Sequence, residues 1–284
     1  MIYDCFLFNN EFDTLDIRLN VLSPIVDKFV LVECQKTFRG KQKPLCFSDN
    51  KYLFRKYEDK IIHVIADSPP HMDFEEKKKQ GSIGNIDWRQ IKVWEIEFFQ
   101  RDAIAKGLVE CEPNDVILIS DVDEIPRVEI IDGLDFSVAP FFTLKEKMCC
   151  YYLDTYFEEP WHGTTILKYK NLIRKGASTW RRLYARGYKI ENGGWHFGRL
   201  VGKKEDAIDK LRDAISSLSV YEFDTEQINN GAFLKKCLAE LVVYQNYYSS
   251  YGTKMKTDDV SNLPRYVQDN YDRFKDYFYD GSNG

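Results

Sequence analysis

Three carboxylates follow one apolar run in the segment VILISDVDEIP, residues 116–126. Asp121 and Asp123 are two residues apart, and residues at this spacing in extended backbone point to the same side. Two oxygen ligands on one side can face one Mn²⁺ or Mg²⁺ ion, and these ions are commonly shared with substrate phosphates. A cation held there would neutralise a departing nucleoside diphosphate, which is Lewis-acid catalysis. The alternative is a solvated turn, because acidic pairs of this kind are common.

These carboxylates stand at the end of an apolar segment that is predicted to be a strand. Strands are predicted over 2–8, 28–34, 60–67 and 115–120, and amphipathic helices over 12–26 and 88–108. Such alternation predicts a mostly parallel sheet with helices on both faces. Open sheets of this kind bind ligands outside the carboxyl ends of their strands. The acidic turn is therefore predicted at the edge of the sheet where active sites occur.

Beyond residue 126 the pattern changes to mixed strands followed by helices. Strands are predicted over 140–157 and 164–173, an irregular Gly-rich and aromatic segment over 178–200, and helices over 203–218 and 225–248. The aromatic tail after Arg265 predicts a short docking helix.

The composition predicts one soluble domain. The 284 residues are 44% hydrophobic and 30% charged, which suits a sizeable core, and the net charge of −5 is mixed along the chain, unlike a nucleic-acid footprint. Seven cysteines without a CxxC pair indicate reduced thiols rather than a zinc site or a disulfide framework. We find neither a signal-peptide pattern nor an apolar run near the roughly 20 residues that span a bilayer, so a cytoplasmic protein is expected.

Several segments, taken in order, resemble glycosyltransferase family seventeen, which contains the bisecting β-1,4-mannosyl-glycoprotein N-acetylglucosaminyltransferases and microbial and viral relatives. The matching segments are YDCFLFNNEFDTLDIRLNVL, FVLVECQKTFRGKQKPL, KIIHVI, FQRDAI, DVILISDVDEIP, GGWHF (193–197) and SLSVYEFDT (217–225). The resemblance implies a GT-A-type fold: a mostly parallel sheet flanked by helices, with a mixed-strand acceptor region and a helical C-terminus. It divides a single domain into a nucleotide-sugar half (1–126), an acceptor half (127–225) and a helical extension (226–284).

The resemblance also assigns roles to the acidic turn. Asp121 and Asp123 match the DxD motif of the family, with Asp123 expected on the metal and Asp121 on the ribose or a metal-bound water. His196 matches the histidine of a GWH element and is a candidate ligand of the metal or contact of the pyrophosphate. The alternative for His196 is a packed structural histidine beside Trp195.

Polar residues at other strand ends are candidates for the donor nucleotide. Asn10 and Glu11 follow the first strand and Glu33 ends the second, where they can contact the uracil and ribose or cap neighbouring segments. In the basic loop 35–44, Lys41 and Arg39 can pair with the diphosphate or be plainly exposed.

One further cation lies on the long helix before the acidic turn. Arg101 can orient Asp121 or a donor phosphate, or it can pair with Glu97 on the helix surface.

An inverting transfer needs a general base for the acceptor hydroxyl. Glu222 matches a later acidic position of the family and is the first candidate, although Val220 replaces a histidine that is frequent there. The other candidate bases are Asp154, Glu158 and Glu159. The candidates for stacking on sugar rings, or for the core, are Trp161, Trp180 and Trp195.

The sequence therefore predicts a metal-dependent, inverting glycosyltransferase that moves N-acetylglucosamine from UDP-N-acetylglucosamine to a glycan hydroxyl. Its cofactor would be Mn²⁺ or Mg²⁺, and its partners the nucleotide sugar and the glycan, without nucleic acid. Alternatives are another UDP-sugar with a surface-polysaccharide acceptor, and a non-catalytic carbohydrate-binding protein. A phosphoryl-transfer enzyme is less favoured because the sequence has no GxxxxGK[ST] loop.

Overall fold

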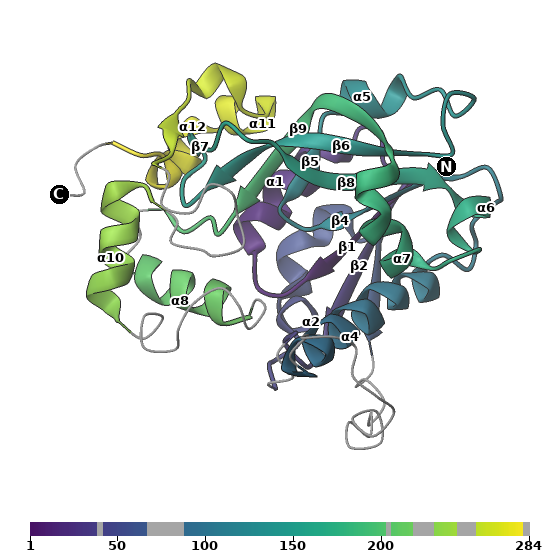
Figure 1. Cartoon of the computed structure of the whole chain (residues 1–284), viewed down its shortest axis with the longest axis horizontal. Helices are drawn as coiled ribbons and strands as arrows, with labels where there is room; N and C mark the ends of the chain where they lie inside the picture. The colour runs from purple at the N-terminus through teal and green to yellow at the C-terminus, as the bar shows by residue number, and fades with distance from the viewer. Residues whose placement is uncertain (39–41, 67–87, 203–205, 218–229, 243–253, 281–284) are drawn as a thin grey trace.

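The computed structural model describes residues 1–38, 42–66, 88–202, 206–217, 230–242 and 254–280. Within them a 10-stranded sheet crosses the molecule, with helices on both faces (Figure 1). Its main path has the order β10-β7-β6-β8-β4-β1-β2-β3, while β5 pairs with β9, and β9 also pairs with β6. The strands are β1 (Ile2–Phe8), β2 (Lys28–Cys34), β3 (Ile61–Ala66), β4 (Val116–Asp121), β5 (Glu124–Pro126), β6 (Phe141–Cys150), β7 (Thr155–Tyr156), β8 (Trp161–Lys168), β9 (Tyr188–Gly198) and β10 (Lys256–Thr257).

Helices cover both faces of this sheet, and most of the described C-terminal part of the chain is also helical. The α-helices are α1 (Phe12–Leu22), α2 (Cys46–Asn50), α4 (Trp88–Asp102), α5 (Val128–Asp132), α6 (Tyr169–Leu172), α7 (Ala177–Arg182), α8 (Ala207–Ser217), α10 (Gly231–Glu240), α11 (Arg265–Asp269) and α12 (Tyr271–Phe274). The 3₁₀ helices are η1 (Lys51–Tyr57), η2 (Ala103–Gly107), η3 (Leu183–Arg186), η4 (Val260–Asn262) and η5 (Lys275–Tyr277).

The four strands β3, β2, β1 and β4 are parallel and keep one register along their whole length. Almost every residue of β1 and β2 is buried, because helices cover both faces and the strands therefore read as continuous apolar runs. On one face η2 and α7 contribute Ile104 and Trp180 to the core. On the other face α1 and α2 contribute Leu15 and Phe47. The predicted parallel half is confirmed.

The second half of the sheet differs in detail from the prediction. The predicted strand 140–157 is two strands, β6 and β7, and the predicted strand 164–173 ends at Lys168, where α6 begins. The chain turns there because the amides of Tyr169 and Lys170 donate to the carbonyls of Asp115 and Pro113, at 2.9 and 3.0 Å, instead of to a strand. The prediction of strand over 169–173 was therefore wrong.

The segment 178–200 was predicted to be irregular and is mostly regular. It contains most of α7, then η3, and then β9, which runs parallel to β6. The register of β6 against β9 shifts between Leu144 and Glu146, so that β9 carries extra residues around Asn192. This bulge interrupts the period-two pattern that would have identified a strand.

The described parts of the chain after residue 206 are mostly helical, as predicted, although Lys256–Thr257 form the short strand β10, which pairs with β7. α8 and α10 pack with Leu211, Leu234 and Leu238 against the end of β6, and Figure 1 shows them together at the left. The tail forms the expected docking segment, because the amide of Leu153 donates to the carbonyl of Tyr277 at 2.9 Å. A mostly parallel sheet half flanked by helices, a mixed-strand half and a largely helical C-terminal region are the arrangement that the sequence predicted. No helix in the described ranges has the length and apolar character that crossing a bilayer requires.

Candidate active site

One buried arginine of α1 donates hydrogen bonds to the backbone of the turn between β4 and β5. Arg18 Nη1 donates to the carbonyls of Asp121, Val122 and Glu124, at 2.9, 3.2 and 2.5 Å. Its Nε and Nη2 donate to Asp4 at 2.7 and 2.5 Å, and the whole side chain is 0% exposed. A buried guanidinium that donates to three carbonyls of the turn fixes the backbone that carries the acidic residues.

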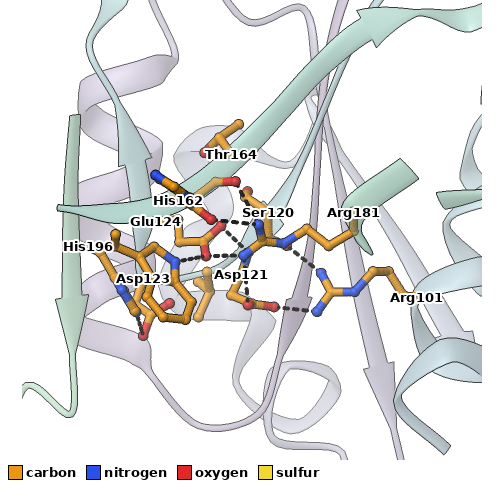
Figure 2. Close-up of polar contacts among 12 residues, drawn as sticks. Arg101, Ser120, Asp121, Asp123, Glu124, His162, Thr164, Arg181 and His196 are labelled. Atoms are coloured by element: carbon orange, nitrogen blue, oxygen red, sulfur yellow. Dashed lines mark hydrogen bonds and ion pairs between the residues drawn. The ribbon is translucent and has the colours of Figure 1, made fainter. Parts of the chain in front are cut away.

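Each carboxylate oxygen of Asp121 faces a different arginine (Figure 2). Arg101 Nη2 lies 2.7 Å from Oδ1 and Arg181 Nη2 lies 3.6 Å from Oδ2. Although burial opposes ionisation, these guanidiniums hold the pKa of Asp121 well below its usual range. Arg101 also pairs with Glu97 at 3.1 Å, so both contacts considered from the sequence occur together.

Asp123 and His196 meet at the exposed side of the turn. Asp123 Oδ2 lies 3.2 Å from His196 Nε2, and the Asp123 side chain is 23% exposed. The pairing of β5 with β9 brings them together, because Glu124 lies opposite His196 and the amide of Phe197 donates to the carbonyl of Asp123 at 2.9 Å.

The charge of His196 follows from its neighbours. Burial alone would lower the pKa of its imidazole, but the Asp123 carboxylate, aided by Glu124 and Glu146, raises it to about 9. The ring of Trp161 packs against the imidazole at a centroid distance of 4.8 Å. His196 Nδ1 is buried and finds no hydrogen-bond partner in the described part of the chain.

Glu124 is a buried carboxylate that joins the turn to the second half of the protein. Its Oε1 accepts from Trp161 Nε1 at 2.6 Å and from Arg181, and its Oε2 accepts from the amide of Asp121 at 3.1 Å. Burial raises the pKa of Glu124, and the Arg181 guanidinium opposes that shift. Arg181 also donates to the carbonyl of Gly163 at 2.6 Å, so it binds β8 and the turn at once.

Glu146 is a second buried acid beside Glu124. Its Oε1 accepts from the amide and hydroxyl of Thr164, at 3.0 and 2.7 Å, while its Oε2 has no hydrogen-bond partner among the described residues. Burial, with the nearby charge of Glu124, raises the pKa of Glu146 to about 8. Its carboxyl lies against Gly163, where any side chain would collide with it.

Sequence reasoning named neither Arg181, Glu146 nor Arg18 as a site residue. Glu146 lies between Lys145 and Lys147 in β6, and three charged residues in a row predict a solvent-exposed segment. Arg181 is followed directly by Arg182, and nothing local distinguishes the inward one.

The candidates at the first two strand ends are engaged with nearby backbone. Glu11 Oε2 accepts from the amides of Asn9 and Asn10, both at 2.9 Å, at the exit of β1 beside Asp121. Glu33 is buried and accepts from the amides of Phe47 and Ser48 at 2.8 and 3.2 Å, at the start of α2. These contacts match the capping alternative that the sequence left open for Glu11 and Glu33, and Asn10 contributes its backbone amide to the contact with Glu11.

The remaining candidates lie apart from the acidic turn or outside the described residues. Lys41, Arg39 and Glu222, with Val220 beside the last, fall outside the described ranges. Asp154 Oδ1 accepts from the amide of Tyr279 at 2.9 Å. Glu158 pairs with Lys256 at the surface, and the neighbouring Glu159 is also exposed.

Of the three tryptophans considered as sugar platforms, Trp161 is the one at the acidic cluster. Trp180 is in the core and donates to the carbonyl of Asn171 at 3.0 Å. Trp195 is buried in another cluster and donates to the carbonyl of Asn262 at 2.9 Å.

The donor set at the turn fits a divalent cation that shares its coordination with a ligand. Within the described residues no group of three or more His, Cys, Asp or Glu is arranged to hold a metal. Asp123 and His196 supply one carboxylate and one imidazole 3.2 Å apart, a pair that suits Mn²⁺. Phosphate oxygens and water commonly complete such sites.

The match to known proteins decides the family. Residues 1–282 match the model described as Glycosyltransferase family 17. The chain belongs to this family. The family resemblance that the sequence indicated is therefore confirmed.

Curated relatives of this family-17 glycosyltransferase share part of its length. The human β-1,4-mannosyl-glycoprotein 4-β-N-acetylglucosaminyltransferase is 32% identical over 120 residues, which is 42% of this chain and 20% of the human protein. The Rattus norvegicus and Mus musculus proteins of the same name are 32% and 31% identical over the same coverage. The chain thus matches about one fifth of the length of these relatives.

Solved structures resemble it only distantly. The galactosyltransferase LgtC in complex with donor and acceptor sugar analogues has a TM-score of 0.34 at 10% identity, over 66% of each chain. The Francisella tularensis 2-C-methyl-D-erythritol 4-phosphate cytidylyltransferase has a TM-score of 0.35 at 9% identity, over 77% of this chain and 100% of its own.

Proposed function

We propose that this family-17 glycosyltransferase transfers N-acetylglucosamine from UDP-N-acetylglucosamine to a hydroxyl of a glycan, with a divalent cation bound at Asp123. The observation that carries the proposal is the acidic turn at the end of β4. There Asp123 is partly exposed beside His196, while Asp121 is already neutralised by two arginines. The names of the curated relatives support N-acetylglucosamine as the transferred sugar.

Asp123 and His196 are the residues that would hold the cation. Mn²⁺ or Mg²⁺ bound there would neutralise negative charge on the departing nucleoside diphosphate. His196 must give up its proton to act as a ligand, and its raised pKa of about 9 makes that loss dependent on pH. Trp161 covers one side of the imidazole and limits its rotation.

The remaining residues of the cluster position these two. Arg18 fixes the turn backbone, and Arg101 and Arg181 fix the carboxylate of Asp121, which is 37% exposed and faces the strand exits where a nucleotide ribose would lie. Glu124 ties Trp161 to the turn, so the imidazole of His196 stays beside Asp123.

The chemical step that we propose is an inverting displacement. An acceptor hydroxyl attacks the anomeric carbon from the side opposite the diphosphate, and a carboxylate takes its proton. Glu222 is the base that we propose, from its match to the family. The acceptor is a glycan, and a surface polysaccharide with a different UDP-sugar is the second candidate that the same site would serve.

The test is to incubate the protein with a panel of nucleotide sugars and Mn²⁺ and to measure slow hydrolysis of each. Only UDP-N-acetylglucosamine should be hydrolysed appreciably, and Asp123→Ala should lower that rate on the order of a thousandfold while the protein stays folded. Asp132→Ala, which removes an exposed carboxylate of α5, is the matched control and should keep the wild-type rate.

Two results would contradict the proposal. If Asp123→Ala retains the wild-type rate, the cation is not held at Asp123. If the wild-type protein binds sugars but hydrolyses no nucleotide sugar and binds no UDP, it is a carbohydrate-binding protein.

A further inference from the structure

A second concave site lies at the edge of the sheet opposite the acidic turn. It is a cavity of about 460 Å³ between the loop that follows α5 and the junction of β8 with α6, which Figure 1 shows at the right, away from α8 and α10. Lys168, at the end of β8, pairs with Val116 at the start of β4, whereas Asp121 ends β4. Five residue steps along a strand span roughly 16 Å, so this cavity is separate from the candidate active site.

The two walls of the cavity are fixed to each other and to the core. Asn171 Nδ2, from α6, donates to the carbonyl of Pro140 at 3.0 Å and so joins the junction to the loop. The amide of Ser137 donates to Asp135 Oδ1 at 2.8 Å, which holds the loop in a turn. Phe136 packs against the hydrophobic core beneath the loop. The cavity is therefore already formed without a ligand, which lowers the cost of binding one.

Two lysines line this cavity, and neither ammonium group forms an ion pair with a carboxylate in the described part of the chain. Lys168 Nζ lies 5.2 Å from the centre of the Phe136 ring. Lys170 Nζ donates to the neutral Asn114 Oδ1 at 3.1 Å. These contacts position the ammonium groups without neutralising their charges. The cavity therefore favours a ligand that carries an anionic group.

The other groups that line the cavity favour a saccharide over a simple anion. Asp135 contributes an exposed carboxylate, which repels a phosphate or sulfate ion but accepts hydrogen bonds from hydroxyl groups. Leu134 and Pro140 contribute apolar surface, against which the C–H face of a pyranose ring can pack. A sugar that carries a carboxylate combines an anionic group, hydroxyl donors and an apolar face in one ring.

We propose that this cavity binds a saccharide that carries a carboxylate group, such as a uronic acid residue of a glycan. The ammonium groups of Lys168 and Lys170 pair with the carboxylate of the sugar, and Asp135 accepts hydrogen bonds from its hydroxyl groups. This inference goes beyond the proposed transfer reaction and does not depend on it, because binding in this cavity requires neither a nucleotide nor a cation.

Titration calorimetry with two sugars that differ in one group tests this inference. Methyl β-D-glucuronide carries a carboxylate where methyl β-D-glucoside carries a hydroxymethyl group. The wild-type protein, without nucleotide or metal, should bind the glucuronide saturably and the glucoside at least about tenfold more weakly, because the ammonium groups attract the carboxylate. Added salt should weaken the binding of the glucuronide, because it screens charges near the surface.

Matched lysine variants locate the site. Lys168→Met combined with Lys170→Met keeps two long side chains and removes both charges, so the affinity for the glucuronide should fall at least about tenfold. Lys175→Met removes an exposed lysine that lies over Trp180 at 5.6 Å rather than in the cavity, and the affinity should stay at the wild-type value. Circular dichroism checks that the variants are folded. If the double variant does not fold, each single variant should still lower the affinity roughly threefold.

Inorganic phosphate is the comparison anion, and it should bind more weakly than the glucuronide. Phosphate that binds as tightly would show a site for simple anions and overturn the inference. The inference is also overturned if the wild-type protein does not bind the glucuronide, binds it no better than the glucoside, or binds it no better than the lysine variants do. None of these results bears on the proposed function, which is tested separately by the hydrolysis of nucleotide sugars.

Discussion

The two halves of the sheet differ in the regularity of their strand pairing. In β3, β2, β1 and β4 the parallel pairing keeps one register, and the strands are buried between helices on both faces. Around β6 the register shifts against both neighbours at the same level, between Thr143 and Lys145 on the β8 side and between Leu144 and Glu146 on the β9 side. The regular half ends in β4 and so positions the acidic turn that follows it. The half around the register shift contributes other side chains that contact this turn.

The buried polar and aromatic side chains near the acidic turn come from the half with the register shifts. The bulged half contributes Glu146, Trp161 and His196, and each of these lies beside or near the turn that the regular half provides. Bulges are frequent next to active sites because they redirect side chains that a regular strand would point elsewhere. Buried acids and a protonated imidazole are stabilised here by pairing across the two halves.

The largest effect is expected where the regular half supports the turn. Arg18→Met would leave Asp4 as a buried unpaired charge and remove the donor to three turn carbonyls. The free energy of unfolding should fall by about 3–5 kcal/mol, measured by urea denaturation. Arg265→Met breaks an exposed pair with Asp269 and should cost under about 1 kcal/mol. Equal losses in the two variants would show that the turn does not depend on Arg18.

A smaller effect is expected at the bulge of β8. A side chain at position 163 would collide with the carboxyl of Glu146, so Gly163→Ala should lower the unfolding free energy by about 1–3 kcal/mol. Gly133→Ala is the control, since the nearest atom to its new methyl group would be 3.5 Å away. In a Glu146→Ala background the cost of Gly163→Ala should largely disappear. If it does not, the collision is not the cause.

The smallest effect is a change in pH dependence at Glu146. Its pKa rises from 4.5 to about 8 on folding, so the folded state holds more protons and stability falls as pH increases from about 5 to 8. Unfolding free energies at pH 6, 7 and 8 should decline by about 1 kcal/mol per pH unit in the wild type. Glu146→Gln removes the contribution of Glu146 to that slope, while the contribution of His196, whose pKa is raised from 6.5 to about 9, remains. Parallel curves for the two proteins would mean that Glu146 titrates normally.

The regular half could be predicted from sequence because burial on both faces makes its strands continuous apolar runs. β9 could not, since its bulge places polar residues and a left-handed Asn192, with φ of 52°, in the middle of the strand. α6 could not, because contacts with the carbonyls of Pro113 and Asp115, distant in sequence, end β8.

Some residues of the candidate site could likewise be predicted from the sequence, and others could not. Asp121 and Asp123 could be found because an acidic turn after a buried strand is visible locally, and His196 because its segment resembles the family. Arg181 and Glu146 could not, because their partners are distant in sequence and only the pairing of the strands shows which charged residues face inward.

Arg18 lies 103 positions before Asp121 in the chain, yet its guanidinium donates hydrogen bonds to the carbonyls of the acidic turn and fixes their positions. The segment VILISDVDEIP is therefore not a self-sufficient unit. If it were grafted onto another protein, it would carry its carboxylates but leave behind the guanidinium that sets their separation. A working graft would also have to include β1 with Asp4 and the first turns of α1.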